Sequence, residues 1–355
     1  MMKKILYLTN IEVPYRVRFF NELAKHCDLT VLYERDRSAN RNDEWARSEK
    51  RNHRVRFLRG IRVGGENAFS LGILKEIFSG YDSVIVGCYN SPVQMLAILA
   101  MRLLRIPYLV NLDGETFLEG KGPKAVLKRF FLSGAEKYLV AGQRAAQSLR
   151  SVFPGRQVIP YYFSSLSGQE VADHRIAPKD RRDGAILVVG QYFDYKGMDI
   201  ALDAARRDDS LHYKFVGMGS RTALFEAEHP VPANVELIPF LQKPELEREY
   251  RACSMLVLPS RQECWGLVIN EAASFGTPIV STWGSGAAVE FLAERYPEYL
   301  ANPGDGEDLY RCIRRLAGDD RRAYSDYLAE KSGCYTIEKC VQAHLAACGL
   351  CEQER

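Results

Sequence analysis

Two glutamates in the second half of the chain, Glu263 and Glu271, are placed so that they could bind two parts of one ligand. A short apolar run ends at Pro259-Ser260, and a helix is predicted to begin near Gly266. Glu263 then lies on the loop before this helix, and Glu271 lies about one turn inside it. A carboxylate at Glu271 can accept hydrogen bonds from the vicinal hydroxyls of a ribose.

The start of the same predicted helix is suited to an anion. The first N–H groups of a helix have no partner within the helix, and the helix dipole adds positive potential there. The amides of Gly266, Leu267 and Val268 therefore predict a site for a diphosphate. Together these residues predict a nucleotide-sugar site, with the ribose at Glu271, the diphosphate at the helix start and the sugar at Glu263.

The whole segment resembles a known signature. Within PSRQECWGLVINEA, Glu263 and Glu271 have seven residues between them, as in the family-4 retaining glycosyltransferases of GT-B fold. Trp265-Gly266 and Gly276-Thr277-Pro278 match this family as well. Two glutamates at this spacing also arise on a solvated helix face, so the signal comes from the complete segment. The resemblance implies metal-independent transfer of a sugar from a nucleotide-diphosphate donor to a hydroxyl, with retention and without a cofactor.

A second segment resembles the family's diphosphate clamp. Val188-Val189-Gly190-Gln191, followed by Lys196-Gly197, is similar to a strand, loop and helix in which an Arg and a Lys bind the donor. The resemblance implies that Lys196 contacts the phosphates, where a compact charge suits a pyrophosphate. Taken alone, Lys196 is typical of a surface lysine. Gln191 stands at the Arg position, which removes one positive charge.

Two shorter segments resemble further parts of the donor site. Phe215-Val216-Gly217-Met218-Gly219 is similar to the family's next strand and glycine turn, which implies that Gly217 lies near the donor. Val235–Phe240 is similar to the stretch that lines the base pocket, which implies a role for Phe240. Glycine pairs after strands are common in other folds, so each match is weak by itself.

The first half resembles a branch of the family found among bacterial surface-polysaccharide enzymes. Pro14-Tyr15-Arg16 replaces the usual Gly-Gly pair, and the resemblance makes Tyr15 and Arg16 candidates for binding phosphate or acceptor. A simple surface arginine is an equal interpretation of Arg16. Asp113, followed by Gly114, stands where many relatives have His-Gly, which implies a catalytic position facing the sugar or the acceptor. An aspartate that caps a turn after a strand is the structural alternative.

Short β-branched runs alternate with longer amphipathic stretches along the chain, which predicts parallel sheets covered by helices. The predicted strands are Ile5–Thr9, Leu29–Tyr33, Arg54–Leu58, Ser83–Cys88, Tyr108–Leu112, Lys137–Val140, Ala185–Val189, Tyr213–Val216, Val235–Pro239, Met255–Leu258 and Pro278–Ser281. Predicted helices include Arg16–His26, Pro92–Leu104, Pro123–Leu132, Gly197–Arg206, Pro244–Cys253 and Val268–Phe275.

Two such series predict an α/β protein of GT-B type, with two Rossmann-like domains and a ligand cleft between them. We expect an acceptor-binding domain over residues 1–163 and a nucleotide-sugar-binding domain over 184–335. The linker is expected at Tyr161–Asp183. The resemblance also implies that a final helix at about 337–350 packs back on the first domain.

The charge of the chain is uneven along its length. Residues 1–165 contain 26 Lys and Arg against 15 Asp and Glu, a net charge of +11, whereas the remainder has a net charge of −8. With 46% hydrophobic and 26% charged residues, the composition excludes disordered, fibrous and collagen-like classes. A basic first half suggests a phospholipid surface, a lipid pyrophosphate or nucleic acid as its partner, or a solvated surface with no partner.

The basic, amphipathic stretch Lys121–Arg129 favours the first of these partners. Relatives often dock on the inner leaflet of the membrane through such a helix, and we find no nucleic-acid-binding motif that would favour RNA or DNA. Arg102 and Arg105 interrupt the best apolar window, and no signal peptide is evident. We therefore expect a cytoplasmic protein, peripheral on the inner face of the membrane.

The cysteines predict neither disulfides nor a metal site. Nine cysteines, an odd number in a long chain, do not form a disulfide framework. Cys340, His344, Cys348 and Cys351 fall near one face of the last helical pattern, where metal binding or apolar packing of reduced thiols are the two interpretations. We expect packing.

The combined prediction is a retaining hexosyltransferase that uses a UDP- or GDP-linked sugar and a saccharide or lipid-linked acceptor in bacterial surface-polysaccharide synthesis. Glu263, Lys196 and Asp113 are the expected catalytic residues. Two alternatives remain at this stage. The first is a non-catalytic sugar-nucleotide-binding subunit of an assembly complex, which the Gln191 departure favours. The second is a GT-B relative of other chemistry, such as an epimerase or phosphorylase.

Overall fold

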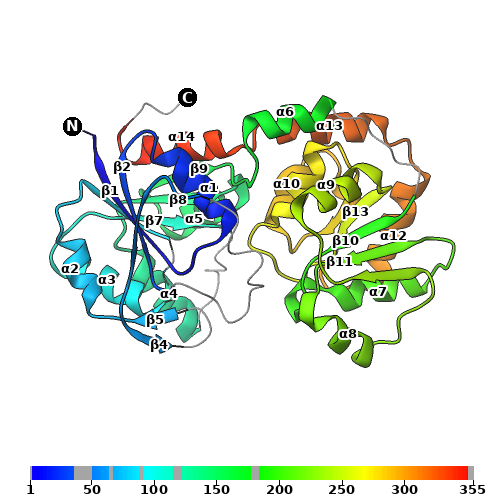
Figure 1. Ribbon diagram of the computed structural model, residues 1–355, viewed down its shortest axis with the longest axis horizontal. Helices are drawn as coiled ribbons and strands as arrows, with labels where there is room; N and C mark the ends of the chain where they lie inside the picture. Colours follow the sequence, from blue (N-terminus) through cyan, green and yellow to red (C-terminus); the bar gives the residue numbers. More distant parts are fainter. Residues whose placement is uncertain are drawn as a thin grey trace. The chain divides into compact units, whose positions relative to one another are not determined.

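The computed structural model describes residues 2–35, 50–63, 67–87, 89, 91–114, 122–176 and 184–350. The chain forms two compact units (Figure 1). Unit 1 comprises the chain up to Ser165 together with the chain from Ile337 onward, and unit 2 comprises Leu166–Thr336.

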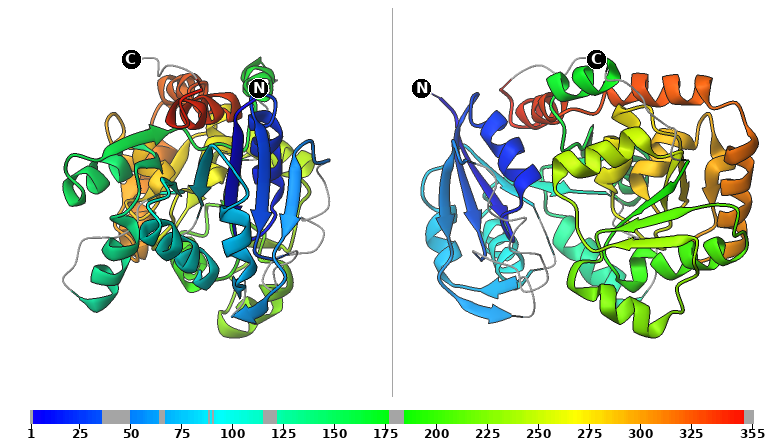
Figure 2. Two further views of the ribbon diagram at one scale, coloured as in Figure 1. Left: turned by 90° about the vertical axis from the view of Figure 1, so that its left-hand side faces the viewer. Right: turned by 45° about the vertical axis from the view of Figure 1, so that its right-hand side comes forward.

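Within the described residues, unit 1 is built on a seven-stranded parallel sheet with the strand order β3-β2-β1-β6-β7-β8-β9. Apart from the edge strand β3, which is mostly exposed, its strands are mainly buried apolar runs, which is the pattern of a sheet covered on both faces. They span β1 (Lys4–Thr9), β2 (Asp28–Tyr33), β3 (Arg54–Phe57), β6 (Ser83–Val86), β7 (Leu109–Leu112), β8 (Lys137–Ala141) and β9 (Gln157–Tyr161). The short antiparallel pair β4 (Ile61–Val63) and β5 (Asn67–Phe69) forms a separate ribbon (Figure 2).

Local sequence signals define several helix starts in unit 1. Proline occupies the first turn of α1, α3 and α4, where its missing N–H costs no hydrogen bond. The Ser91 hydroxyl caps α3 by accepting the Gln94 N–H at 3.2 Å. The helices are α1 (Pro14–Leu23), α2 (Gly72–Ile77), α3 (Pro92–Leu103), α4 (Pro123–Leu132), α5 (Gln143–Val152) and α14 (Ile337–Ala347).

The last helix, α14, packs on unit 1 although it follows all of unit 2 in the sequence. It lies against α1 and β9, as the red ribbon in Figure 1 shows. The Lys137 ammonium donates to the Ala347 carbonyl at 3.0 Å and the Lys3 ammonium donates to the Cys348 carbonyl. Cations at these carbonyls complement the negative end of the helix dipole.

The described part of unit 2 contains a six-stranded parallel sheet with the order β12-β11-β10-β13-β14-β15. Its strands are β10 (Ile186–Val189), β11 (Tyr213–Val216), β12 (Val235–Ile238), β13 (Met255–Leu258), β14 (Ile279–Thr282) and β15 (Leu300–Ala301). Its helices are α6 (Gly168–Ile176), η2 (Asp194–Lys196), α7 (Met198–Arg206), η3 (Gly219–Arg221), α8 (Thr222–Glu228), α9 (Lys243–Ala252), α10 (Leu267–Ser274), α11 (Gly286–Leu292), η4 (Pro297–Tyr299), α12 (Gly306–Gly318) and α13 (Arg322–Ser332).

The structure corrects the prediction around residues 161–183. Tyr161 is the last residue of β9, and α6 occupies a large part of the expected linker and contacts α10 of unit 2. Residues 177–183 of that linker lie outside the described part of the chain. The strands β4, β5, β9 and β15 were not predicted, because each is short, partly polar or interrupted by proline.

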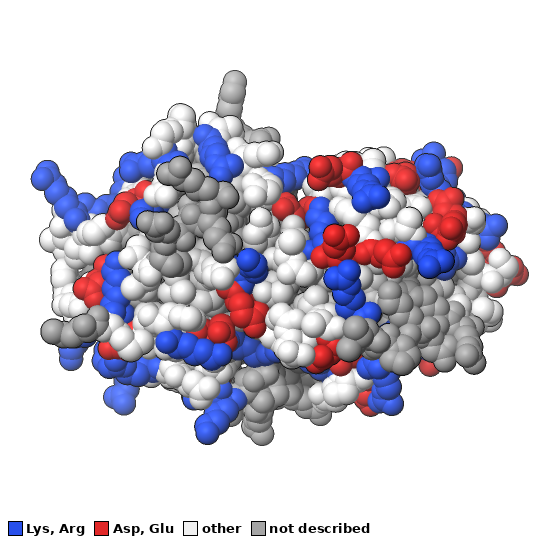
Figure 3. All heavy atoms as spheres, turned by 90° about the horizontal axis from the view of Figure 1, so that it is seen from above, with Lys and Arg blue, Asp and Glu red and all other residues white. Residues whose placement is uncertain are grey.

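The excess of basic residues in the first part of the sequence is visible on the surface of unit 1. On the face in Figure 3, the part formed by unit 1 presents mainly basic side chains, whereas unit 2 presents acidic and basic side chains side by side.

Candidate active site

Two loops of unit 2 lie next to each other at the carboxyl edge of its sheet: the β10 loop, residues 190–197, and the β13 loop, residues 259–266. From β10 the chain runs outward to β11 and β12 and then returns to the other side of β10 as β13. Open parallel sheets bind ligands beyond the carboxyl ends of the strands at such a reversal. The two loops therefore occupy the position that this topology favours for a ligand.

Gly197 brings the two loops into contact. Its φ is +69°, and a Cβ at this position would lie 2.1 Å from the Pro259 carbonyl oxygen, so only glycine fits without a shift of the backbone. The Tyr195 carbonyl accepts the N–H groups of Arg261 and Gln262 at 2.9 and 3.2 Å. Backbone contacts alone thus fix the β10 loop against the β13 loop.

The Arg261 side chain adds a second connection between these loops. Its guanidinium donates two hydrogen bonds, at 2.8 and 2.6 Å, to the two carboxylate oxygens of Asp199 in the first turn of α7. It also donates to the Asp194 carbonyl at 2.8 Å. Burial opposes ionisation of Asp199, but the hydrogen bonds and charge of Arg261, together with backbone N–H groups, outweigh burial and lower the pKa of this carboxyl. Sequence reasoning missed this pair, for which the signal is a basic residue three positions after the end of β13.

Lys196 and Glu263, which sequence analysis assigned to different parts of one ligand, contact each other directly. The Lys196 ammonium donates to a carboxylate oxygen of Glu263 and forms an ion pair with it. The two side chains are 21% and 16% exposed, so the pair is largely shielded but still reachable by solvent. Lys196 ends the short helix η2, and Glu263 lies in the middle of the β13 loop.

A glycine-containing turn after β14 holds the backbone of Glu263. The Glu263 N–H donates to the Gly284 carbonyl at 2.8 Å, and the Gly286 N–H donates to the Glu263 carbonyl at 3.1 Å. A Cβ at Gly284 would lie 2.4 Å from the Arg261 carbonyl oxygen, and one at Gly286 would lie 2.3 Å from the Cys264 carbonyl oxygen. Sequence analysis missed this support, for which Trp-Gly-Ser-Gly at 283–286 is the signal.

The start of α10, where sequence analysis expected an anion, is a glycine-capped helix end. Gly266 caps the helix with a φ of +101°, and the Ile269 N–H is bonded to the Gly266 carbonyl at 3.0 Å. The amides of Leu267 and Val268 precede Ile269 in the first turn, where the N–H groups point out of the helix end. The Trp265 indole N–H donates to the Asn270 side chain at 2.9 Å and anchors the turn.

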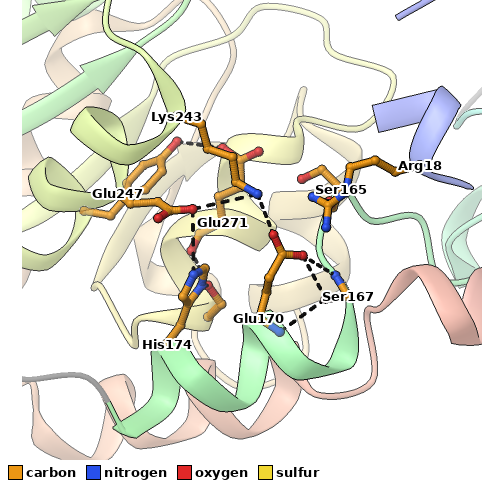
Figure 4. A network of polar contacts seen from close by, with 10 residues as sticks. Arg18, Ser165, Ser167, Glu170, His174, Lys243, Glu247 and Glu271 are labelled. Carbon is orange, nitrogen blue, oxygen red and sulfur yellow. Dashed lines mark hydrogen bonds and ion pairs between the residues drawn. The ribbon is translucent and has the colours of Figure 1, made fainter. Parts of the chain in front are cut away.

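Glu271 lies one turn inside α10, next to a small pocket. The Tyr250 hydroxyl donates to one of its carboxylate oxygens at 3.0 Å, and burial together with this carboxylate raises the pKa of Tyr250. Residues of α6 and α9 complete the surroundings in Figure 4: the Lys243 ammonium donates to Glu170 at 2.6 Å, and His174 lies 3.8 Å from Glu247. The pocket is lined by Leu166, His174, Lys243, Leu246, Glu247, Tyr250, Glu271 and Phe275.

The other donor-site candidates follow the carboxyl ends of neighbouring strands. Gly190 directly follows β10, Gly217 directly follows β11 with a φ of +102°, and half-buried Phe240 follows β12. The Gly190 N–H donates to the Val216 carbonyl at 2.9 Å, and the Gly217 N–H donates to the Ile238 carbonyl at 3.1 Å. Gln191 is exposed beside them. The fold therefore brings all these residues to the same edge of the sheet as Lys196.

In unit 1, Asp113 is the partly exposed end of a buried polar network. Its side chain is 35% exposed, whereas that of its ion-pair partner Arg16 is only 7% exposed. Asn111 and the Tyr161 hydroxyl donate to Asp113 Oδ1 at 3.0 and 2.8 Å, and Arg16 donates to Oδ2. The expected candidate Asp113 is therefore held by three groups from α1, β7 and β9.

Arg16 is not the surface residue that one interpretation expected. It is buried, its guanidinium lies 5.3 Å from the centre of the Phe163 ring, and it donates to the Tyr7 hydroxyl at 3.3 Å. Burial opposes its charge, but Asp113 and the surrounding tyrosines together outweigh burial and raise the pKa of Arg16. The neighbouring Tyr15 makes an edge-to-face contact with Phe163, with the ring centres 5.8 Å apart.

His344 of α14 completes this network, and sequence analysis did not predict its contact. The fully buried imidazole has one nitrogen 2.8 Å from Asn111 Oδ1 and the other 2.8 Å from the Cys340 carbonyl oxygen. Burial lowers the pKa of His344 to about 4. Among the residues that the structure describes, no group of three or more His, Cys, Asp or Glu could hold a metal ion. Cys351, the fourth member of the predicted cluster, lies outside them.

Comparison with known proteins agrees with this architecture. Residues 170–331 match the protein family described as glycosyl transferases group 1. An uncharacterized glycosyltransferase of Methanocaldococcus jannaschii is 25% identical over 286 residues, which cover 78% of this chain and 77% of that protein. A D-inositol 3-phosphate glycosyltransferase of a Mycobacterium species is 27% identical over 200 residues, which cover 51% of this chain and about half, 46%, of that protein.

Among solved structures, Anabaena HepE in complex with UDP-glucose is similar over 98% of this chain and 100% of its own, with a TM-score of 0.71 and 17% sequence identity. The two parallel-sheet α/β units thus have the GT-B fold. The chain is a glycosyltransferase, and the part of it that matches the group 1 family model is residues 170–331. Within the described residues, no helix has the length and apolar character that a membrane span requires.

Proposed function

We propose that this protein is a retaining glycosyltransferase of family 4, which transfers a sugar from a UDP- or GDP-linked donor to a hydroxyl of a saccharide or lipid-linked acceptor. The observation that carries the proposal is the position of Lys196, Glu263 and the α10 start at the reversal point of the unit 2 sheet. A cation, a carboxylate and unpaired helix amides at one place match the parts of a nucleotide-diphosphate sugar.

In this proposal the donor lies along α10. Glu271 binds the ribose hydroxyls with the carboxylate that Tyr250 orients, and the amides of Leu267 and Val268 bind the diphosphate together with Lys196. Phe240 and Gly217 lie beside the base and the phosphates, beyond β12 and β11. HepE, which has the same fold, is a UDP-glucose complex, and this supports a nucleotide-sugar as the donor.

Catalysis then consists of positioning and of stabilising the charge that develops on the leaving diphosphate. Retention places the acceptor hydroxyl on the face that the diphosphate leaves, so the diphosphate takes the hydroxyl proton. Glu263 orients the sugar through its hydroxyls. Lys196 and the helix amides supply the positive charge that a metal ion supplies in other transferases, and we propose that the reaction needs no metal and no cofactor.

We further propose that unit 1 binds the acceptor through Asp113, in bacterial surface-polysaccharide synthesis. The Asp113 carboxylate is fixed by buried partners and remains partly exposed, as a group that binds a hydroxyl must be. Tyr15 and Arg16 belong to the Pro-Tyr-Arg segment that resembles the surface-polysaccharide branch. Because Arg16 is buried against Asp113, its role would be to hold this carboxylate rather than to contact phosphate itself.

A lipid-linked acceptor would be reached from the inner face of the membrane. On α4, Val126, Leu127 and Phe130 are 53%, 52% and 47% exposed, and Lys124 is exposed among them. Lys128 and Arg129 lie on the same helix. Exposed apolar side chains interspersed with basic ones favour adsorption to an anionic surface, at roughly 1 kcal/mol per basic residue near the surface. We therefore propose a cytoplasmic, peripherally bound enzyme with no nucleic-acid partner.

The test is donor binding and turnover with a matched pair of lysine variants. Lys196 and Lys214 are 21% and 23% exposed, and both form ion pairs with glutamates in unit 2, but Lys214 lies on β11, outside the two loops. Lys196→Met should lower kcat/KM for the donor about a hundredfold, and Lys214→Met should leave it within about twofold. Turnover of a panel of UDP- and GDP-sugars with a polyprenyl-linked acceptor, with and without EDTA, checks this and the metal independence.

A non-catalytic sugar-nucleotide-binding subunit remains the second candidate, because exposed Gln191 stands where the family has a cationic residue. Binding of a nucleotide-sugar without turnover for any acceptor would favour this candidate. Equal kinetics of the two lysine variants would contradict the donor site itself.

A further inference from the structure

The β10 and β13 loops are joined by two ion pairs that cross. Lys196 of the β10 loop contacts Glu263 of the β13 loop. In the opposite sense, Arg261 of the β13 loop contacts Asp199, just after the β10 loop. Each loop thus contributes one cation to a carboxylate on the other side.

The two pairs differ in how firmly they are held. The guanidinium of Arg261 donates hydrogen bonds to both carboxylate oxygens of Asp199 in a bidentate arrangement. It also donates a hydrogen bond to the Asp194 carbonyl. A planar guanidinium that binds a carboxylate through two hydrogen bonds cannot be replaced by an ammonium that makes only one contact. Lys196 contacts one oxygen of Glu263 through an ammonium on a flexible stem. The Lys196 contact is therefore the one that an incoming anion can replace without disturbing the loops.

We propose that Glu263 stands in for the donor diphosphate when the site is empty, and that donor binding exchanges this ion pair for two others. This inference rests on the proposed donor site. The diphosphate takes Lys196 from Glu263, and the released carboxylate accepts hydrogen bonds from the sugar hydroxyls. The Arg261–Asp199 pair stays intact and keeps the two loops in register during the exchange.

The exchange gives the site a preference for the complete donor. A nucleotide-sugar offers Glu263 new partners, namely its hydroxyls, when Lys196 is withdrawn. A nucleoside diphosphate lacks the transferred sugar and offers Glu263 no such hydroxyls. Glu263 then loses its cation and remains a partly buried carboxylate beside an anion, which is unfavourable. Glu263 therefore weakens the binding of the product relative to that of the substrate and promotes product release.

The test measures the affinity of nucleoside diphosphates by calorimetry with UDP and GDP, using whichever binds. Glu263→Gln removes the competing charge and keeps the shape of the side chain. It should tighten nucleoside diphosphate binding about fivefold, the scale of one partly exposed ion pair. It should not tighten binding of the corresponding nucleotide-sugar, because the carboxylate contacts to the sugar are lost at the same time. The control is Glu249→Gln, which removes the partner of Lys214, whose ion pair has nearly the same exposure, and it should change neither affinity.

General repulsion between Glu263 and the diphosphate would also tighten binding in Glu263→Gln, and a double-mutant cycle separates the two explanations. In a Lys196→Met background, Glu263 has no lysine to occupy, so the fivefold gain from Glu263→Gln should disappear. A gain of the same size in both backgrounds would overturn the exchange and leave simple repulsion.

Three other outcomes of these experiments each test a different claim. Weaker or unchanged nucleoside diphosphate binding by Glu263→Gln would overturn the exchange while leaving the donor site in place. Failure of the wild-type protein to bind any nucleotide would contradict the proposed function instead. Loss of binding in Arg261→Lys, with Lys196 and Glu263 intact, would support the loop-holding role of the Arg261 guanidinium, and wild-type affinities in that variant would refute it.

Discussion

The contact between the β10 and β13 loops can be tested with one methyl group. In Gly197→Ala, the added Cβ would lie 2.1 Å from the Pro259 carbonyl oxygen, a separation that no relaxed structure contains. The nearby atom belongs to the backbone, so it cannot rotate away as a flexible side chain would. Either the two loops separate or unit 2 loses stability.

The size of the effect follows from two contributions. An L-residue at a φ of +69° costs about 1–2 kcal/mol, and alanine recovers roughly 0.5 kcal/mol because it restricts the unfolded chain. The clash adds the cost of overpacking, about 1–3 kcal/mol. The expected loss is therefore roughly 2–4 kcal/mol, a large part of the total stability of an ordinary domain.

Gly219→Ala is the matched control. Gly219 also lies in unit 2 with a φ of +56°, but a Cβ there would meet nothing within 4 Å, so only the backbone contribution of about 1 kcal/mol remains. Urea unfolding of both variants and calorimetric donor binding at low temperature measure the outcome. Equal stabilities for the two variants, with wild-type donor affinity in Gly197→Ala, would refute the argument that this close approach builds the site.

Two further predictions concern unit 1 and the pH dependence of stability. Asp113→Asn should lower kcat/KM for the acceptor at least tenfold and leave the donor Kd unchanged, and steady-state kinetics with calorimetry would show a wrong assignment if donor binding were lost as well. Burial lowers the pKa of His53, His174 and His344 to about 4. Between pH 6.5 and 4 the unfolded chain therefore binds more protons at these residues than the folded chain does. Stability should fall as the pH falls through this range. Urea midpoints should show a shallower fall in His344→Gln, and an unchanged slope would contradict the lowered pKa of this residue.

The sequence predicted most strands of the two sheets, and the helices that it named, to within one to three residues. Regular alternation of apolar runs and amphipathic stretches suffices for this, because parallel strands covered on both faces must be apolar throughout. It failed for β9, whose run Gln157–Tyr161 begins with a polar residue and contains Pro160. It also failed for α6, because this polar surface helix at the start of unit 2 has nearly the composition of a linker.

The candidate site residues have signals in the sequence, whereas their contacts do not. A helix start, a lysine and two glutamates each suggest a ligand group, so sequence analysis placed Lys196 on the phosphates and Glu263 on the sugar. It did not predict that these side chains would bind each other, since that depends on β10 and β13 being neighbours. The same reason hid Arg261–Asp199 in unit 2 and the contact of His344 with Asn111 in unit 1, where the partners lie 233 positions apart.

The crossed ion pairs also bear on Gln191, which stands in place of a cationic residue in the proposed donor site. Residues 190–199 and 259–266 contain two cations, Lys196 and Arg261, and three carboxylates, Asp194, Asp199 and Glu263. Arg261 is committed to Asp199 by two hydrogen bonds, and Asp194 is 93% exposed, where water screens its charge. Of the cations in these two segments, Lys196 is thus the one that can move to a diphosphate. In the proposed exchange, the positive charge that these two segments offer to the donor therefore depends on whether Glu263 holds Lys196 or releases it.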